Sequence, residues 1–481
     1  MNSGRRHILA MAISMVLVIQ AATNSYGQAE DSTDGLTEVS LSADRFVGMS
    51  GTTEPIRRLI GNVRLIQDKT TLRSALATQW VDSDRILFEG QVLVVDEGDT
   101  LRADSVLYFR KTKIGNASGR VVLNDDEVRV LSTSTIYDVD EKHSTFDKGV
   151  TLIDSTSTLN GDGGEYFSDE KRAEFYGNVV FEDSSTTILS DSVTYLRDEE
   201  SASARGSVLI TVIDAADDSL ATPDIFRIAG PAAFSDRSNN SNRISGRATA
   251  MRVEPDSAGV YTDTLLVNAD LIYAVRSDAR DSLQGSGNVV IWSGDVAALA
   301  DSMQILSQDS TADELVLTGA PIVWLDDSQL TADTIKVYII EGDVDSVFAT
   351  GNVFLARPDS VSGQVQQVRG RTLSGAITDS GRDVFVVGPN AEAIHFVSRD
   401  DELQGAVRAS ADRIVFYVED DEPVRISIIS GVEGLYYQAE DIPVGMSLSG
   451  FLWQPQRRPT KEIVVEEWPP HMTQSIEQDT Q

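Results

Sequence analysis

Residues that could carry acid–base, nucleophilic or metal chemistry are few in this sequence, and their spacing does not assemble a site. The chain of 481 residues has four histidines and no cysteine. His143 and His395 each lack a second ligand at a metal-binding spacing, and His7 and His471 stand near the ends of the sequence. No serine sits in the Gly-x-Ser-x-Gly turn of a hydrolase. We therefore expect no enzyme activity, no metal and no cofactor.

Acidic residues are the remaining candidates. The hexapeptide Asn160–Glu165 offers carboxylate and amide oxygens, but it lacks the alternating ligand order of an EF-hand, so its glycines indicate a bulge and a tight turn. A set of aspartates recurs along the chain, one per repeat: Asp104, Asp162, Asp191, Asp301, Asp333 and Asp412. Spread in this way, they are more typical of residues that cap a bend through local backbone hydrogen bonds than of an acid–base pair.

A fixed spacing also governs the apolar residues and the glycines. An aliphatic residue recurs every 29 residues, at Leu72, Leu101, Val130, Leu159 and Ile188. Glycine keeps this step at Gly61, Gly90, Gly119, Gly177 and Gly206, whereas Gly149 is displaced by one residue. A second run, with a step of about 32 residues, carries Gly287, Gly319 and Gly351. Such a period predicts repeats that bury their apolar faces against neighbours, so function should belong to a long surface or groove.

The elements within one repeat are predicted to be bent β-strands. Residues 101–109 alternate apolar and polar side chains, and the apolar phase slips by one residue at Ala103–Asp104. A one-residue slip turns every later side chain to the other face, and a bulge at the aspartate would return both halves to one interior. A second strand follows each repeated glycine, and short Asp-, Ser- and Gly-rich turns join the strands. Connections this short favour antiparallel pairing. A right-handed parallel β-helix solenoid is the alternative.

Charge restricts the partners. The formal net charge is −35, from 75 acidic and 40 basic residues. This balance argues against nucleic acid, which binds a basic surface, and against adhesion to anionic lipid surfaces. A hydrated, soluble exterior is the simpler interpretation, and divalent-cation binding along the acidic turns is the alternative.

Composition also divides the chain into segments. Residues 1–27 have a basic start, an apolar stretch from Ile8 to Ala22 and a small-residue cleavage pattern, which indicates a cleaved signal peptide and export to the periplasm, either free or associated with the outer membrane. The apolar stretch is about 15 residues long, and a membrane span needs roughly 20. The following segments are a flexible N-terminus at 28–40, repeats at 41–212, an irregular insertion or seam at 213–264, repeats at 265–452 and a disordered tail at 453–481.

Two alternating motifs carry a family resemblance over roughly residues 41–430. Gly-Asn-Val-x-apolar occurs at Gly177–Phe181, Gly287–Ile291 and Gly351–Leu355, and the aspartate-centred strand motif occurs at Leu101–Tyr108. The pattern resembles the OstA-like proteins, which include the LptA-type periplasmic bridge of lipopolysaccharide export and the N-terminal domain of its outer-membrane partner. The resemblance implies an all-β fold: an elongated, V-shaped antiparallel β-jelly roll with a hydrophobic groove, built here from ~29–32-residue repeats.

The resemblance further implies a non-enzymatic lipid conduit. Its groove would be lined by Val92, Leu101, Val106, Tyr108, Val179, Phe181, Val193, Tyr195, Val289, Ile291, Ile335, Val353 and Leu355. The expected partners are lipopolysaccharide or another acylated lipid, an inner-membrane component with a jelly roll associated with an export pump, and an outer-membrane assembly barrel, with no nucleic acid. The competing hypotheses are a structural or adhesive acidic β-solenoid with calcium in its turns, and a polysaccharide-processing β-helix enzyme.

Overall fold

The computed structural model describes residues 39–465 except for short internal gaps. These gaps are 51–52, 68–69, 84, 97–98, 125–127, 139, 214–224, 256–260, 278–279, 295, 309–311, 341–342, 360–361, 379–381, 400–401 and 420–421. The expected signal peptide at 1–27 and nearly all of the expected flexible start at 28–40 lie outside the described residues.

The chain divides into two compact units, with the boundary between Val208 and Leu209. This boundary lies inside strand β15 (Ser201–Ile213), beside the segment at 213–264 that was expected to be an irregular insertion or seam. The described part of that segment consists of strands, because β16 (Ile225–Asp236) and β17 (Ser241–Pro255) occupy most of it. The strand pattern therefore continues through it.

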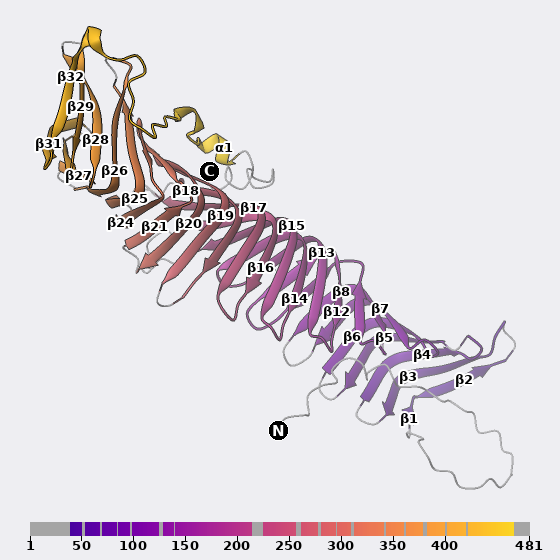
Figure 1. Cartoon of the computed structure of the whole chain (residues 1–481). Helices are drawn as coiled ribbons and strands as arrows, with labels where there is room; N and C mark the ends of the chain where they lie inside the picture. Colours follow the sequence, from indigo (N-terminus) through magenta and orange to yellow (C-terminus); the bar gives the residue numbers. More distant parts are fainter. Residues whose placement is uncertain are drawn as a thin grey trace, which may run out of the picture. The chain divides into compact units, whose positions relative to one another are not determined.

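Unit 1, up to Val208, is built from β-strands in the part of it that the structure describes (Figure 1). Its strands before β15 are β1 (Val39–Ser42), β2 (Arg45–Met49), β3 (Ile56–Gln67), β4 (Thr70–Trp80), β5 (Arg85–Asp96), β6 (Asp99–Phe109), β7 (Ile114–Asn124), β8 (Arg129–Asp138), β9 (His143–Phe146), β10 (Val150–Ile153), β11 (Thr158–Gly161), β12 (Gly163–Phe167), β13 (Arg172–Glu182) and β14 (Thr186–Leu196).

The long strands of unit 1 pair with their neighbours along the chain. The strands β3 to β8 form consecutive antiparallel pairs. Where a strand bends sharply, its two halves count as separate strands. For example, β9 and β10 both pair with β8, and β11 and β12 both pair with β13. The repeat of 29 residues is therefore one antiparallel pair of long, bent strands with its turns.

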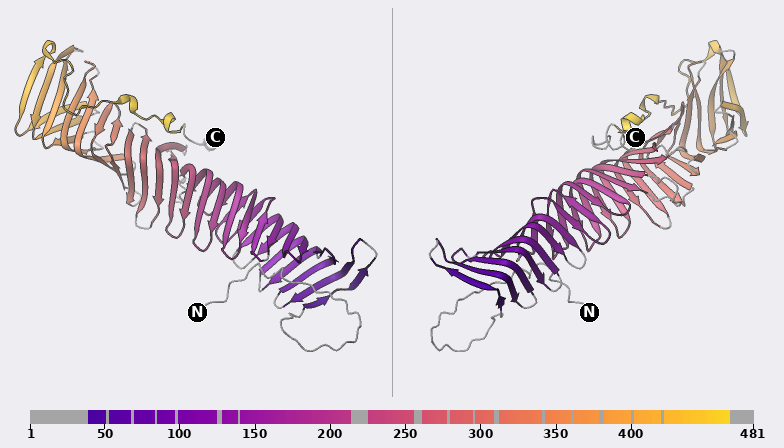
Figure 2. Two further views of the ribbon diagram at one scale, coloured as in Figure 1. Left: turned by 45° about the vertical axis from the view of Figure 1, so that its right-hand side comes forward. Right: turned by 180° about the vertical axis from the view of Figure 1, so that it is seen from behind.

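Unit 2 has the same kind of antiparallel arrangement, and its last described elements are short helical turns (Figure 2). After β16 and β17 come β18 (Tyr261–Val275), β19 (Asp281–Ser293), β20 (Val296–Gln308), β21 (Ala312–Thr318), β22 (Ile322–Leu325), β23 (Ser328–Thr331), β24 (Thr334–Ile340), β25 (Asp343–Pro358), β26 (Val365–Ala376), β27 (Arg382–Gly388), β28 (Ala391–Arg399), β29 (Glu402–Ala411), β30 (Arg413–Glu419), β31 (Glu422–Ile429), β32 (Glu433–Gln438), the 3-10 turns η2 (Ala439–Asp441) and η3 (Pro455–Arg457), and the helix α1 (Lys461–Val465).

Bulges produce the bends, as the slip in the apolar phase predicted. Between β13 and β14 the pairing jumps from Tyr176–Ser192 to Val179–Ser190, so that Gly177 and Asn178 together face Asp191. Two residues opposite one make a β-bulge, which bends the strand and resets its inside–outside alternation. The bend predicted at Ala103–Asp104 is confirmed, because the register of β6 against β7 shifts between Arg102 and Ser105.

Aspartates close the tight turns at the strand ends. In the turn between β10 and β11, Asp154 Oδ1 accepts hydrogen bonds from the backbone N–H groups of Thr156 and Ser157 at 2.8 and 2.7 Å. Asp183 does the same between β13 and β14. Burial acts to raise the pKa of Asp154, but the hydrogen bonds outweigh it and hold the pKa below its usual value.

The fold is an antiparallel, all-β jelly roll, as the sequence predicted. Every strand pairing that the structure describes is antiparallel, for example β3 with β4 and β25 with β26. Stacked rungs of a parallel β-helix would pair in parallel, so that alternative is wrong. Part of the segment 453–481, which was expected to be a disordered tail, has regular structure. Residues 455–465 contain η3 and α1, and Val464 is fully buried, whereas 466–481 lie outside the described residues.

Candidate functional site

In each unit, each bent strand has two arms, one on either side of its bend. The arms on one side form one wall and those on the other side form a second wall, and the apolar side chains of both walls point into the same interior. In unit 1, Val92 pairs with Ala103 on one arm of the β5–β6 pair, and Phe88 pairs with Val106 on the other arm. All four side chains are less than 5% exposed. Residues next to them in the strands, such as the exposed Arg102 before Ala103, point outward because successive side chains of a strand alternate faces.

One aromatic contact shows that the two walls of unit 1 face each other. Phe181 lies on the arm of β13 that pairs with Ile188, and Tyr195 lies on the arm of β14 that pairs with Ala173. The two rings therefore come from opposite sides of the bend, yet their centroids are 6.3 Å apart with planes tilted by 56°. This distance is typical of a direct aromatic contact. The walls thus enclose a narrow apolar interior in which their own side chains meet.

The structure brings together all the groove residues predicted for unit 1. Each is at most 6% exposed: Val92, Leu101, Val106, Tyr108, Val179, Phe181, Val193 and Tyr195. They alternate with polar or half-buried residues on the outer faces of the same strands, such as Val180 beside Phe181. The alternation in the sequence was sufficient to find them, since burial on one face leaves a period of two.

In unit 2 the predicted residues also face the interior, with one difference. Val289, Ile291, Ile335 and Val353 are at most 3% exposed. Leu355 shares a face with Val353 but is only half-buried. Its neighbours Phe354 and Ala356, which point to the opposite face, are more deeply buried, at 5% and 1% exposure. The wall of unit 2 is therefore covered on both faces.

Sequence reasoning missed this second apolar face of unit 2. Apolar residues of both parities occupy its strands, as in Ile322-Val323-Trp324 of β22 and Val353–Ala356 of β25. Continuous apolar runs of this kind are the signal of a strand buried on both sides. These continuous apolar runs are present in the sequence. The predicted motif considered only every second residue, so it did not include the residues of the other face.

The recurring aspartates line the bends, where each carboxylate lies against the glycine of a neighbouring strand. The pairs are Asp44 with Gly61, Asp104 with Gly119, Asp162 with Gly177, Asp191 with Gly206, Asp270 with Gly287, Asp301 with Gly319 and Asp333 with Gly351. In four of them the asparagine after the glycine donates from Nδ2 to the carboxylate at 2.7–3.2 Å: Asn62, Asn178, Asn288 and Asn352. The repeated Gly-Asn is thus one side of a corner contact, and the aspartate is the other.

This contact corrects the expected role of the aspartates. They were predicted to cap the bends through local backbone hydrogen bonds, but the bonds of Asp104 and Asp162 reach the neighbouring strand, 15 or more residues away. The reason is that the bulge turns the Gly–Asn backbone to positive φ, +73° and +45° at Gly177 and Asn178, which presents the asparagine amide to the carboxylate of the strand beside it. A structural role therefore accounts for the carboxylate ladder.

The remaining polar candidates do not converge on a site. His143 lies in β9, where its Nε2 is 3.0 Å from Glu165 Oε2 and its ring stacks on Phe167. His395 lies in β28, with Nδ1 3.1 Å from Gln366 Oε1. Within Asn160–Glu165, Asp162 occupies a corner and Asn160 accepts from Thr151. In the described part of the chain, no three acidic or histidine side chains are grouped to hold a metal ion.

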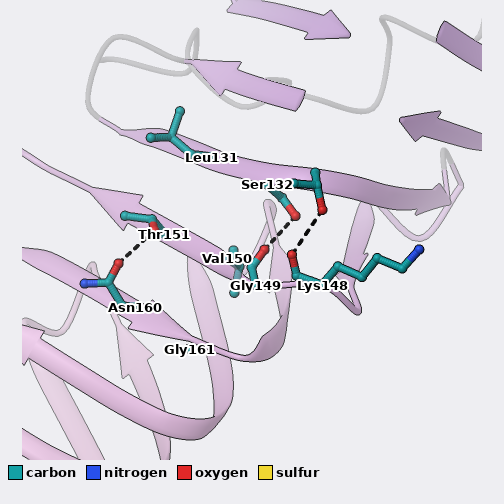
Figure 3. Close-up of a pocket in the computed structure, with 9 residues that line it drawn as sticks. Leu131, Ser132, Lys148, Gly149, Val150, Thr151, Asn160 and Gly161 are labelled. Atoms are coloured by element: carbon teal, nitrogen blue, oxygen red, sulfur yellow. Dashed lines mark hydrogen bonds between the residues drawn. The ribbon is translucent and has the colours of Figure 1, made fainter. Parts of the chain in front are cut away.

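A shallow pocket marks the position where Gly149 departs from the repeat (Figure 3). Three residues, 147–149, lie between β9 and β10, whereas the glycine bulges of β7 and β13 leave two residues unpaired against the next strand. Ser132 Oγ donates to the carbonyl oxygen of Gly149 at 2.7 Å, and Thr133 Oγ1 donates to that of Lys148 at 3.2 Å. These hydroxyls replace the aspartate of other corners. The extra residue explains the one-residue displacement in the sequence, and the Lys148 side chain extends away from the strands (Figure 3).

Comparison with known proteins finds a similarity in the first part of the chain. Residues 39–191 match the model of the OstA-like protein family, and this stretch lies within unit 1. A search of curated proteins found no match. Among the helices that the structure describes, none has the length and apolar character needed to cross a membrane.

Proposed function

We propose, on the premise that residues 39–191 are an OstA-like domain, that this protein is a non-enzymatic, periplasmic lipid-binding bridge. It would carry lipopolysaccharide or a similar acylated lipid toward the outer membrane for assembly. The OstA-like family is a transport and binding family. The observation that carries the proposal is the apolar interior of unit 1, where the walls meet at Phe181 and Tyr195.

The physical properties of this interior suit acyl chains. Its lining in unit 1 is apolar along both walls, and the described carboxylates lie at the bends or on the outside. Transfer of an acyl chain from water into such an interior contributes about 0.8 kcal/mol per methylene group. Because the side chains of the two walls already touch, a chain must displace contacts such as Phe181–Tyr195, so the net gain is smaller than the transfer value. Loading would therefore separate the walls.

The acidic composition of the chain also bears on where a lipid would bind. The net charge of −35 opposes adsorption to an anionic membrane surface, so a lipid would be held by the interior and handed on at an end. The chain has no Gly-rich phosphate loop with a following lysine, so the energy for transport would come from a partner pump.

Co-purification of lipid tests the proposal. The full chain, expressed with export in a Gram-negative host and purified without detergent, should release long-chain acylated lipid on organic extraction, detected by mass spectrometry. Lipopolysaccharide in amounts comparable to the protein would support the bridge, and a different acylated lipid would keep the conduit but change its cargo. A preparation that contains no acylated lipid, and takes none from added lipopolysaccharide, would refute it.

Edge strands are the proposed docking points for the partners. In unit 1, β1 and β2 pair only with β3 among the described strands, and Phe46 on β2 is 52% exposed. In unit 2, β31 and β32 carry Val424, Leu435 and Tyr436 at 57–61% exposure. Unpaired strand edges accept further strands through backbone hydrogen bonds. We propose that the partners are the jelly-roll component of an inner-membrane export pump and an outer-membrane assembly barrel.

Site-specific cross-linking should separate the edge from the middle of unit 1. A photo-reactive residue at Phe46 is expected to cross-link a partner in cells, because β2 presents a free edge. The matched control is Tyr176 in β13, which is 48% exposed but lies on a strand paired on both sides. Partner cross-links that form from Tyr176 as readily as from Phe46 would contradict edge docking.

A further inference from the structure

The second apolar face of unit 2 is covered by the end of the described chain. We call residues 439–465, from η2 to α1, the C-terminal clasp. Figures 1 and 2 show it running back from β32 along one side of unit 2, and α1 packs against β18 and β19. The face that it covers is the outer one, since Phe354 and Ala356 point away from the interior residues Val353 and Leu355.

Buried side-chain amides on this outer face bind the backbone of the clasp. Gln329, 1% exposed, forms two hydrogen bonds: its Nε2 donates to the carbonyl oxygen of Leu452 at 2.6 Å, and its Oε1 accepts from the N–H of Gln454 at 2.8 Å. Gln367, 2% exposed, accepts from the N–H of Leu448 at 2.8 Å. These side chains form hydrogen bonds with the backbone N–H and C=O groups of the clasp, as the backbone of a neighbouring strand does in a sheet.

A third amide and an arginine extend the same contacts along the clasp. Asn268 of β18, 3% exposed, donates from Nδ2 to the carbonyl oxygen of Val464 at 3.2 Å. Arg369 of β26 donates to the carbonyl oxygen of Ser449 at 2.9 Å. Strands β18, β23 and β26 do not pair with one another, so the clasp connects strands that the sheet itself leaves apart.

Two apolar anchors hold the clasp at separate points. Leu448, 2% exposed, packs with Phe354, Ile394 and Phe396. Val464 is fully buried, and the Lys461 ammonium lies 5.6 Å from the centre of the Trp292 ring. Between the anchors Leu452 is 44% exposed, whereas its neighbours Phe451 and Trp453 are partly buried against the cluster around Phe354. The clasp is therefore attached through its backbone and a few sockets, and it is not a strand of the sheet.

We propose that the outer face of unit 2 is a binding site for an extended polypeptide, with Asn268, Gln329 and Gln367 as its backbone-reading groups and the C-terminal clasp as its occupant. A polar amide that is almost fully buried requires a partner, and water cannot reach these amides while the clasp is bound. With the clasp released, the site would expose Phe354 and Phe396 and would accept the same peptide supplied in trans. This inference does not depend on any lipid.

Peptide rebinding tests the site directly. The full chain with Leu448→Asp and Val464→Asp is expected to release the clasp, because each change places a carboxylate in a closed apolar socket. A fluorescently labelled synthetic peptide of residues 439–465 should then bind, measured by anisotropy, and should not bind the unaltered chain, whose site is filled. Adding Gln329→Leu should weaken binding about tenfold, since it removes two hydrogen bonds at nearly constant volume. Binding that is unaffected by Gln329→Leu would overturn the assignment.

A second measurement keeps the proposal testable if the released variant does not fold. In the otherwise unaltered full chain, Gln329→Leu with Gln367→Leu should speed amide hydrogen exchange across 439–465 at least fivefold, and leave the interior strand β24 unchanged. Gln404→Leu is the control, because the Gln404 side chain is exposed on β29 and donates to the carbonyl oxygen of Glu402 on the same strand. Equal protection of the clasp in the double variant and the control would show that the amides do not hold it.

Discussion

Val106→Asp and Val193→Asp should each destabilise unit 1 by about 3 kcal/mol or more and abolish lipid co-purification. Both side chains point into the interior and are 2% and 3% exposed, and no described cation lies in the apolar lining beside them. A carboxylate there loses its hydration without gaining a partner. The measurement is the shift of the urea midpoint, together with lipid extraction from the surviving folded protein.

The control for these two variants is Val180→Asp. Val180 lies on β13 between the interior residues Val179 and Phe181, but it points outward and is half-buried. Its replacement should lower the free energy of unfolding by about 1 kcal/mol or less and leave lipid binding intact. Equal effects at Val106, Val193 and Val180 would show that the assignment of inside and outside faces is wrong.

Gly206→Ala should destabilise unit 1 by roughly 2–4 kcal/mol, through two separable causes. The backbone of Gly206 has a φ of +74°, and a Cβ there would lie 2.1 Å from Asp191 Oδ2. The first cause is the strain of a positive φ, and the second is the collision with the corner carboxylate. Chemical denaturation of the variant measures their sum.

Gly149→Ala isolates the first cause. Gly149 has a similar φ of +69°, but no atom lies within 4 Å of an added Cβ. We expect a cost of about 1–2 kcal/mol, from backbone strain alone. In an Asp191→Ala background, Gly206→Ala should fall to the same cost, since the colliding carboxylate is gone. If Gly206→Ala and Gly149→Ala cost the same in the native background, the corner contact is not what requires glycine at 206.

Much of the fold was readable from local patterns. A strand buried on one face leaves an alternation of two, and a bulge leaves a one-residue slip in that alternation, so the bent strands and the interior set from Val92 to Val353 followed from the sequence. Short turns such as Asp154–Ser157 indicated antiparallel pairing. Even the displacement of Gly149 corresponds to a real insertion at a corner.

Contacts between distant segments could not be predicted from the sequence, because they depend on which surfaces meet after the strands have bent. The sequence by itself determined the strands, their bends, their apolar interior side and the absence of a spaced catalytic or metal-binding motif. Only the tertiary structure decided that corner aspartates bond to the next strand, as Asp162 does to Asn178, and that Gln329 and Gln367 are buried under residues 439–465. Local periodicity indicates which face of a strand is buried. It does not indicate which segment covers that face, and for the outer face of unit 2 the covering segment lies more than 80 residues away along the chain.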